Sequence, residues 1–244
     1  MLLDSQITRL QQPAEMPGRE IGFNPVTESE QCAPGPRERL SFESLVAGLT
    51  FIRRTKVLLA AITLDMFAVL LGGATALLPV FSTDILHVGP VGLGWLRAAP
   101  SIGATLVALV IAHRPPFERA GRTLLWVVAG FGVATVVFGL SWSFPLSLLM
   151  LATLGGLDQV SVVIRGTLLL VQTPDALRGR VNAVHNVFVG ASNELGEFES
   201  GFVAHFVGAV ATVAAGGVGT ILVVLLIAAI WPEVRRLGRL QEAA

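Results

Sequence analysis

Three acidic residues, Glu194, Glu197 and Glu199, interrupt a long apolar region of the sequence. On a helix with about 100° between neighbours, Glu194 and Glu197 share a face roughly 120° wide with Asn186 and Asn193. The same face holds Asn182, Gly190, Ser200 and Gly201. The opposite face is apolar, with Val184, Phe188, Ala191, Leu195, Phe198 and Phe202. Charge inside a membrane helix is costly, so the polar face predicts a path for a proton or a polar solute.

Further charged residues lie inside other apolar segments, and their depth suggests how they pair. Asp65 and Arg165 each lie near the inner third of their segments, so we expect them to form an ion pair. Arg97 lies near the outer end of its segment, level with Glu197 and Glu199. Because Glu199 points about 160° away from the other two glutamates, it is predicted to pair with Arg97 or to anchor the helix at the membrane surface.

This assignment leaves Glu194 and Asp158 near mid-depth without a cation. A carboxylate in that position can take up and release a proton, so both belong to the predicted proton or substrate path. The alternative is that all these charges form structural hydrogen-bonding pairs only.

The sequence gives little support for catalytic or metal chemistry. The four histidines, His87, His113, His185 and His205, are not grouped at metal-ligand spacing. Gly190-Ala-Ser192 resembles a nucleophile turn only superficially, because no histidine with an orienting acid matches its depth. The single cysteine, Cys32, excludes an intramolecular disulfide and a cysteine-based metal site. We therefore predict no enzyme activity, no metal and no cofactor.

Composition indicates a protein that crosses the membrane several times. Of 244 residues, 53% are hydrophobic and only 14% are charged, whereas soluble domains carry about 25% charged residues. The mean hydropathy is +0.71. There is no basic tract typical of nucleic-acid binding, so the expected surroundings are a lipid bilayer and a small-molecule substrate.

Six apolar segments, each about long enough to span a ~30 Å hydrocarbon core, predict an all-α six-helix transmembrane domain over 57–231. The spans are expected near 57–81, 91–112, 123–141, 145–171, 181–204 and 208–231. Residues 1–40 are predicted to be a flexible cytoplasmic tail, and 232–244 a second one. Residues 41–56 are expected to form an amphipathic helix at the membrane surface, or simply a lead-in to the first span.

The distribution of basic residues predicts the orientation of the bundle. Of the thirteen lysines and arginines after position 50, eleven lie before the first span, between spans two and three, between four and five, or after six. The alternate loops, 82–90, 142–144 and 205–207, contain no lysine or arginine. Basic loops stay on the cytoplasmic side, so we predict a multi-pass protein of the cell (inner or plasma) membrane with both termini cytoplasmic.

Two cytoplasmic loops carry a family resemblance. The loop after the second span reads Glu118-Arg119-Ala120-Gly121-Arg122 and resembles the Asp-Arg-x-Gly-Arg motif of the major facilitator superfamily. The loop after the fourth span ends in Arg178-Gly179-Arg180. Together with the acidic stretch that follows, it is similar to the transmembrane secretion effector branch of bacterial efflux permeases. The resemblance covers roughly residues 41–235.

The resemblance implies one half of a two-half transporter, with the motif order of the C-terminal half. Spans one, two, four and five would border the cavity or the other half, and spans three and six would face lipid. All the charges within spans fall in the first group.

The implied function is export of small amphipathic solutes, such as drugs or siderophores, by proton antiport and alternating access. The expected partner is an N-terminal half or a second copy of the chain. The alternative is a non-transporting remnant, or a membrane interaction module that must pair with another half-bundle.

Overall fold

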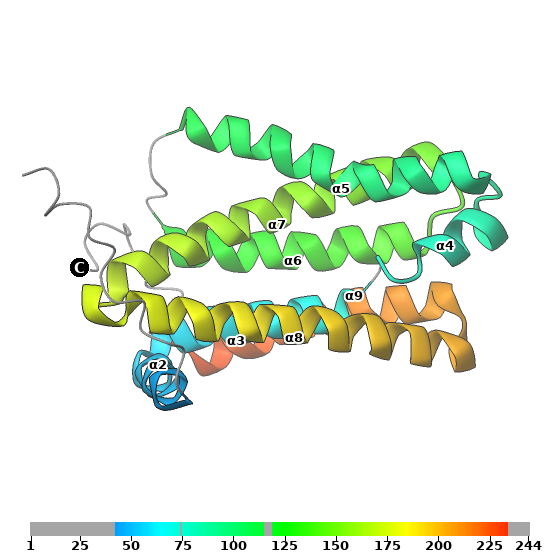
Figure 1. Ribbon diagram of the computed structural model, residues 1–244. Coiled ribbons are helices and arrows are strands. Elements are labelled where there is room, and N and C mark those ends of the chain that lie inside the picture. Colours follow the sequence, from blue (N-terminus) through cyan, green and yellow to red (C-terminus); the bar gives the residue numbers. More distant parts are fainter. Residues whose placement is uncertain (1–41, 74, 115–118, 234–244) are drawn as a thin grey trace, which may run out of the picture. The chain divides into compact units, whose positions relative to one another are not determined.

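The computed structural model describes residues 42–73, 75–114 and 119–233, and in these ranges the chain is helical and has no strands (Figure 1). The predicted all-α fold is confirmed. The helices are α2 (Phe42–Arg54), α3 (Lys56–Leu71), α4 (Leu78–Val80), a π-helical turn η1 (Phe81–Ile85), α5 (Gly89–Ala112), α6 (Ala120–Gly139), α7 (Phe144–Gln172), α8 (Asp175–Val207) and α9 (Ala209–Ile230). The predicted tail over 1–40, most of the predicted tail over 232–244, and Glu118 lie outside the described residues.

Four of these helices, α5, α6, α7 and α9, are long and apolar enough to cross a membrane. They place the protein in a membrane, because each presents large apolar side chains on its outer surface. α8 is long enough at 33 residues but carries the acidic stretch. α3 has only 16 residues, fewer than the roughly 20 needed to span the hydrocarbon core.

The predicted first span, 57–81, is therefore not one continuous helix. α3 stops where the Gly72 N–H donates to the Ala68 carbonyl oxygen at 2.9 Å. A Cβ at Gly73 would collide with the Ser200 hydroxyl and the Gly196 carbonyl oxygen of α8. The helix ends here because the glycine pair lets α8 approach the backbone closely, and glycine weakens a helix interior. Helical structure resumes at Leu78–Val80, where Pro79 occupies the first turn.

The helices form two layers joined along one edge (Figure 1). In the first layer α5 packs along α7, and α7 packs along α6. In the second layer α3 packs against α8 and α9, and the extensive contact of α6 with α9 joins the layers. α7 and α8 are consecutive in the chain but hardly contact each other. The two layers consequently diverge between α7 and α8.

Apolar clusters hold the layers together. One cluster joins α3, α6, α7 and α9 through Leu64, Leu124, Ile164 and Val224. A second surrounds η1, where the rings of Phe81 and Phe138 stack with their centres 4.7 Å apart.

A third cluster fixes α2 to the start of α8. It contains Ile52 of α2 together with Val181 and Val184 of α8. A Cβ at Gly48 would lie 2.9 Å from the Arg180 carbonyl oxygen, so α2 and α8 approach closely. The position of α2 relative to a membrane surface stays a prediction.

Candidate functional site

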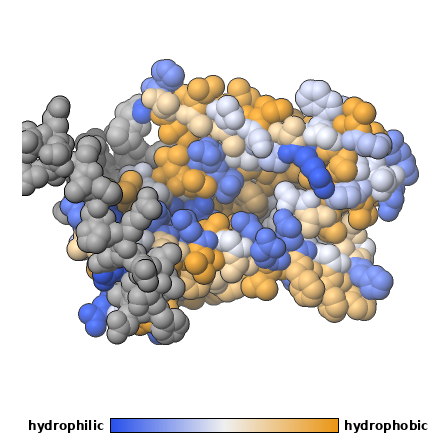
Figure 2. All heavy atoms as spheres, viewed as in Figure 1, coloured by the Kyte–Doolittle hydropathy of each residue, from blue (hydrophilic) through white to orange (hydrophobic). Residues whose placement is uncertain are grey.

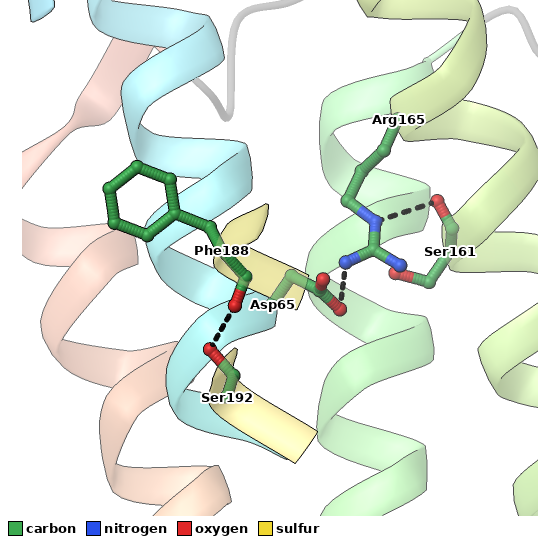
Figure 3. A network of polar contacts seen from close by, with 5 residues as sticks. All are labelled: Asp65, Ser161, Arg165, Phe188 and Ser192. Carbon is green, nitrogen blue, oxygen red and sulfur yellow. Dashed lines mark hydrogen bonds and ion pairs between the residues drawn. The ribbon is translucent and has the colours of Figure 1, made fainter. Parts of the chain in front are cut away.

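A buried ion pair joins the two layers. Arg165 of α7 contacts the carboxylate of Asp65 on α3 through Nη1 (Figure 3). The Arg165 Nε also donates to the Ser161 carbonyl oxygen at 3.3 Å. Asp65 and Arg165 are 5% and 4% exposed, respectively. This is the ion pair predicted from the similar depths of Asp65 and Arg165 in their segments. Its part in a transport cycle stays a prediction.

The face of α8 that packs on α3 consists of small residues four apart, Ser192, Gly196 and Ser200. A Cβ at Gly196 would lie 3.0 Å from the carbonyl oxygens of Val69 and Leu70. The Ser192 hydroxyl donates back to the Phe188 carbonyl oxygen at 2.7 Å (Figure 3). Ser200 is therefore buried against α3 and does not belong to the open polar face on which the sequence placed it. Small side chains are needed here because the two backbones are so close.

A polar groove opens beside this contact, between α7 and α8. Asp158 of α7 and Asn193 and Glu197 of α8 line one cavity of about 190 Å³. All three residues are exposed on the surface of the chain. Figure 2 shows hydrophilic side chains gathered along the hollow between the upper and lower helices. The arrangement brings two carboxylates and an amide to one exposed surface of an apolar bundle, where they can bind a proton or a polar group of a solute.

The groove continues into a second cavity of about 540 Å³, which Glu197 shares with Arg97 and Thr75. In the described part of the chain, Arg97 has no carboxylate within 4.0 Å. The predicted Arg97–Glu199 pair is thus not formed in this conformation. Glu199 lies two positions after Glu197 on the helix, which turns it about 160° away from the groove.

Glu194 does not line these two cavities, although it is exposed. It lies two residues before Gly196 and so points about 160° away from the α3 contact. The predicted path therefore divides at this point: Asp158, Asn193 and Glu197 lie together, and Glu194 faces away from the bundle.

Asn186 lies in a third cavity, of about 590 Å³, between the end of α7 and the first turns of α8. Arg165, Arg178 and Gly179 line it as well. Arg178 pairs with Asp175 at 2.5 Å, and its Nε donates to the Thr173 carbonyl oxygen at 3.3 Å. The sequence reasoning did not single out Thr173 or His185 as site residues, although both line this cavity. The four-residue spacing of Asn182 and Asn186 is the signal that marks this wall.

The other loop residues lie at the start of α6. Gly121 is buried, whereas Arg119 and Arg122 are exposed. The Arg119 carbonyl oxygen accepts a hydrogen bond from the Thr123 hydroxyl at 3.1 Å. Arg180, of the other loop, lies in the first turns of α8. Among the described residues, no three His, Cys, Asp or Glu side chains gather as metal ligands would.

Comparison with known proteins identifies relatives among the enterobactin exporters. The chain is 28% identical over 203 residues to the enterobactin exporter EntS of Escherichia coli O81 (strain ED1a). The exporters of the same name from Citrobacter koseri and Shigella boydii serotype 18 match equally well. Each match covers 83% of this chain and 48% of the relative, so the chain spans about half the length of the curated relatives it matches. No family model and no solved structure matches.

Proposed function

We propose that this chain, which is similar to enterobactin exporters, belongs to the major facilitator superfamily. It forms one half of a membrane exporter and occupies the position of the C-terminal half. Its solutes are small amphipathic molecules such as drugs or siderophores, which leave the cytoplasm by alternating access coupled to proton antiport. Both termini face the cytoplasm. An N-terminal half, or a second copy of the chain, supplies the other wall of the cavity.

The observation that carries this proposal is the open polar groove between α7 and α8. Asp158, Asn193 and Glu197 are exposed there, on a bundle whose other helices present large apolar side chains outward. Leaving a charged side chain in contact with lipid costs about 2.5–3.5 kcal/mol or more. A covering half-bundle removes that cost and encloses a water-filled cavity.

Within this cavity the residues have distinct roles. Asp158 and Glu197 take up and release the coupling proton, because each is a carboxylate in the groove and neither has a basic residue within 4.0 Å among the described residues. Asn193 lines the same cavity and donates or accepts hydrogen bonds with the solute. The Arg97 guanidinium forms an ion pair with Glu197 when the cavity changes shape. Asp65 and Arg165 form the pair that breaks and re-forms between the inward- and outward-open states.

The test is proton-driven efflux from vesicles that contain this chain assembled with an N-terminal half from a related exporter. Asp158→Asn and Glu197→Gln are expected to abolish the dependence of efflux on the pH gradient while downhill efflux of the solute continues. Glu199→Gln, on the far side of α8, is the matched control and should behave as wild type. Unchanged pH-driven efflux in both Asp158→Asn and Glu197→Gln overturns the proton role. A stable, strictly monomeric chain that supports no efflux in this assembly favours the non-transporting remnant.

A further inference from the structure

The cavity where α7 meets α8 is set apart from the carboxylate groove by the chemistry of its walls. Its polar lining side chains are Arg165, Thr173, Arg178, Asn182, His185 and Asn186, and no carboxylate lines it. Each of these side chains can donate a hydrogen bond. The groove cavity that Asp158 and Glu197 line, in contrast, includes two carboxylates and no basic side chain. Two cavities on one surface thus have opposite chemical preferences.

Two buried polar atoms in this wall lack partners. The Thr173 hydroxyl and Nδ1 of His185 are buried and make no hydrogen bond within the part of the chain that the structure describes. Thr173 is only 2% exposed. Leaving a buried polar atom unpaired is unfavourable, so a bound group that forms hydrogen bonds with these atoms is stabilised by them.

The two arginines differ in how firmly they are neutralised. Arg165 is buried and paired with Asp65, so its charge is largely compensated. Arg178 is 48% exposed, and its partner Asp175 is 85% exposed. Ion pairs that are this exposed are weak, so an incoming anion competes with Asp175 for the Arg178 guanidinium. Arg178 also lies in the first turn of α8, where the helix dipole favours negative charge.

We propose that this cavity binds the oxyanion group, phosphate or carboxylate, of an amphipathic molecule. Arg178 supplies the charge, and Asn182, His185 and Thr173 supply further hydrogen bonds. The volume of about 590 Å³ exceeds what an oxyanion alone fills, and Leu169 and Leu170 of α7 line the wall for an apolar body. The same chemistry fits a soluble anion or a lipid headgroup. The site stands on its own geometry and does not require transport.

The experiment measures thermal unfolding of the purified full chain in a nonionic detergent. The probes are inorganic phosphate, hexyl phosphate and dilauroyl phosphatidic acid, with chloride at equal ionic strength as the reference. Hexyl phosphate is expected to raise the melting temperature in a saturable way. Arg178→Gln should weaken its apparent affinity roughly tenfold, because it removes a charge-assisted hydrogen bond. Asn182→Asp should weaken binding further, because it places a carboxylate in the wall.

Arg114→Gln is the matched control, since Arg114 is an exposed arginine that does not line the cavity. It removes the same charge and should change the affinity less than twofold. Protection by the soluble phosphates assigns a soluble anion to the site, and protection by phosphatidic acid alone assigns a lipid headgroup. Equal responses of Arg178→Gln and wild type, or no protection by any probe, overturn the site. Efflux in the assembled carrier is measured in a separate experiment. A chain that binds the phosphate probes but supports no efflux would therefore contradict the proposed transport and leave the binding site intact.

Discussion

At the scale of single residues, the ion pair between Asp65 and Arg165 makes the sharpest stability prediction. Both side chains are buried, and each compensates the charge of the other. Asp65→Asn leaves the Arg165 guanidinium buried without its counter-charge, so we expect the free energy of unfolding in mixed micelles to fall by about 3–5 kcal/mol. The double variant Asp65→Asn/Arg165→Gln removes both charges and should recover most of that loss.

The control for this prediction is Asp84→Asn, which changes an exposed aspartate with no ion-pair partner among the described residues. It should leave the free energy of unfolding within about 0.5 kcal/mol of wild type. A double variant that is as unstable as the sum of its single changes would show that the two side chains do not act as a pair.

The glutamates of α8 differ in position, and this difference predicts unequal effects on transport. Glu197 lines both groove cavities, whereas Glu194 lines neither. In the assembled carrier, Glu197→Gln should therefore impair proton-coupled efflux more than Glu194→Gln does. The initial rate of efflux at several pH gradients measures this. A larger effect at Glu194 would place the proton path outside the groove.

At the scale of elements, the close contact between α5 and α7 depends on glycines, which have no side chain. A Cβ at Gly155 would overlap the Pro100 carbonyl group, and one at Gly103 would overlap that of Ala152. Gly155→Ala forces the two helices apart, so we expect it to lower the free energy of unfolding by about 1–3 kcal/mol. Gly166→Ala on the same helix meets no atom within 4 Å. It should be neutral or stabilising by up to about 1 kcal/mol, and equal losses in both variants would contradict the proposed contact.

The helices and their depths could be predicted from the sequence, whereas the break between α3 and α4 could not. The apolar segments and the charges within them were enough to predict the helical fold and the common depth of Asp65 and Arg165. Hydropathy and depth along a span can be read from the local sequence. The break after Leu71 was missed, because Gly72 and Gly73 read equally well as small residues inside a span. Its cause is a neighbour distant in sequence, α8 at Gly196 and Ser200. The same contact buries Ser200, which helical periodicity alone placed on the open face.

At the scale of the whole bundle, the position of the groove predicts which surface a second half covers. Gly190 of α8 is exposed, and a Cβ there meets no atom within 4 Å. A large side chain at this position leaves the chain's own packing unchanged but obstructs any partner that covers the groove. Leu225 of α9 is 62% exposed on the surface that we expect to face lipid.

When the chain is co-expressed with a tagged N-terminal half from a related exporter, we therefore expect wild type and Leu225→Trp to co-purify with it. Gly190→Trp should reduce the co-purified fraction several-fold, while its melting temperature alone stays within a few degrees of wild type. Native mass spectrometry of the same samples distinguishes a complex of two halves from a pair of identical chains, and Gly190→Trp should reduce both. Undiminished association of Gly190→Trp would mean that the partner binds another surface, in which case the carboxylates of the groove would need a different explanation for their exposure.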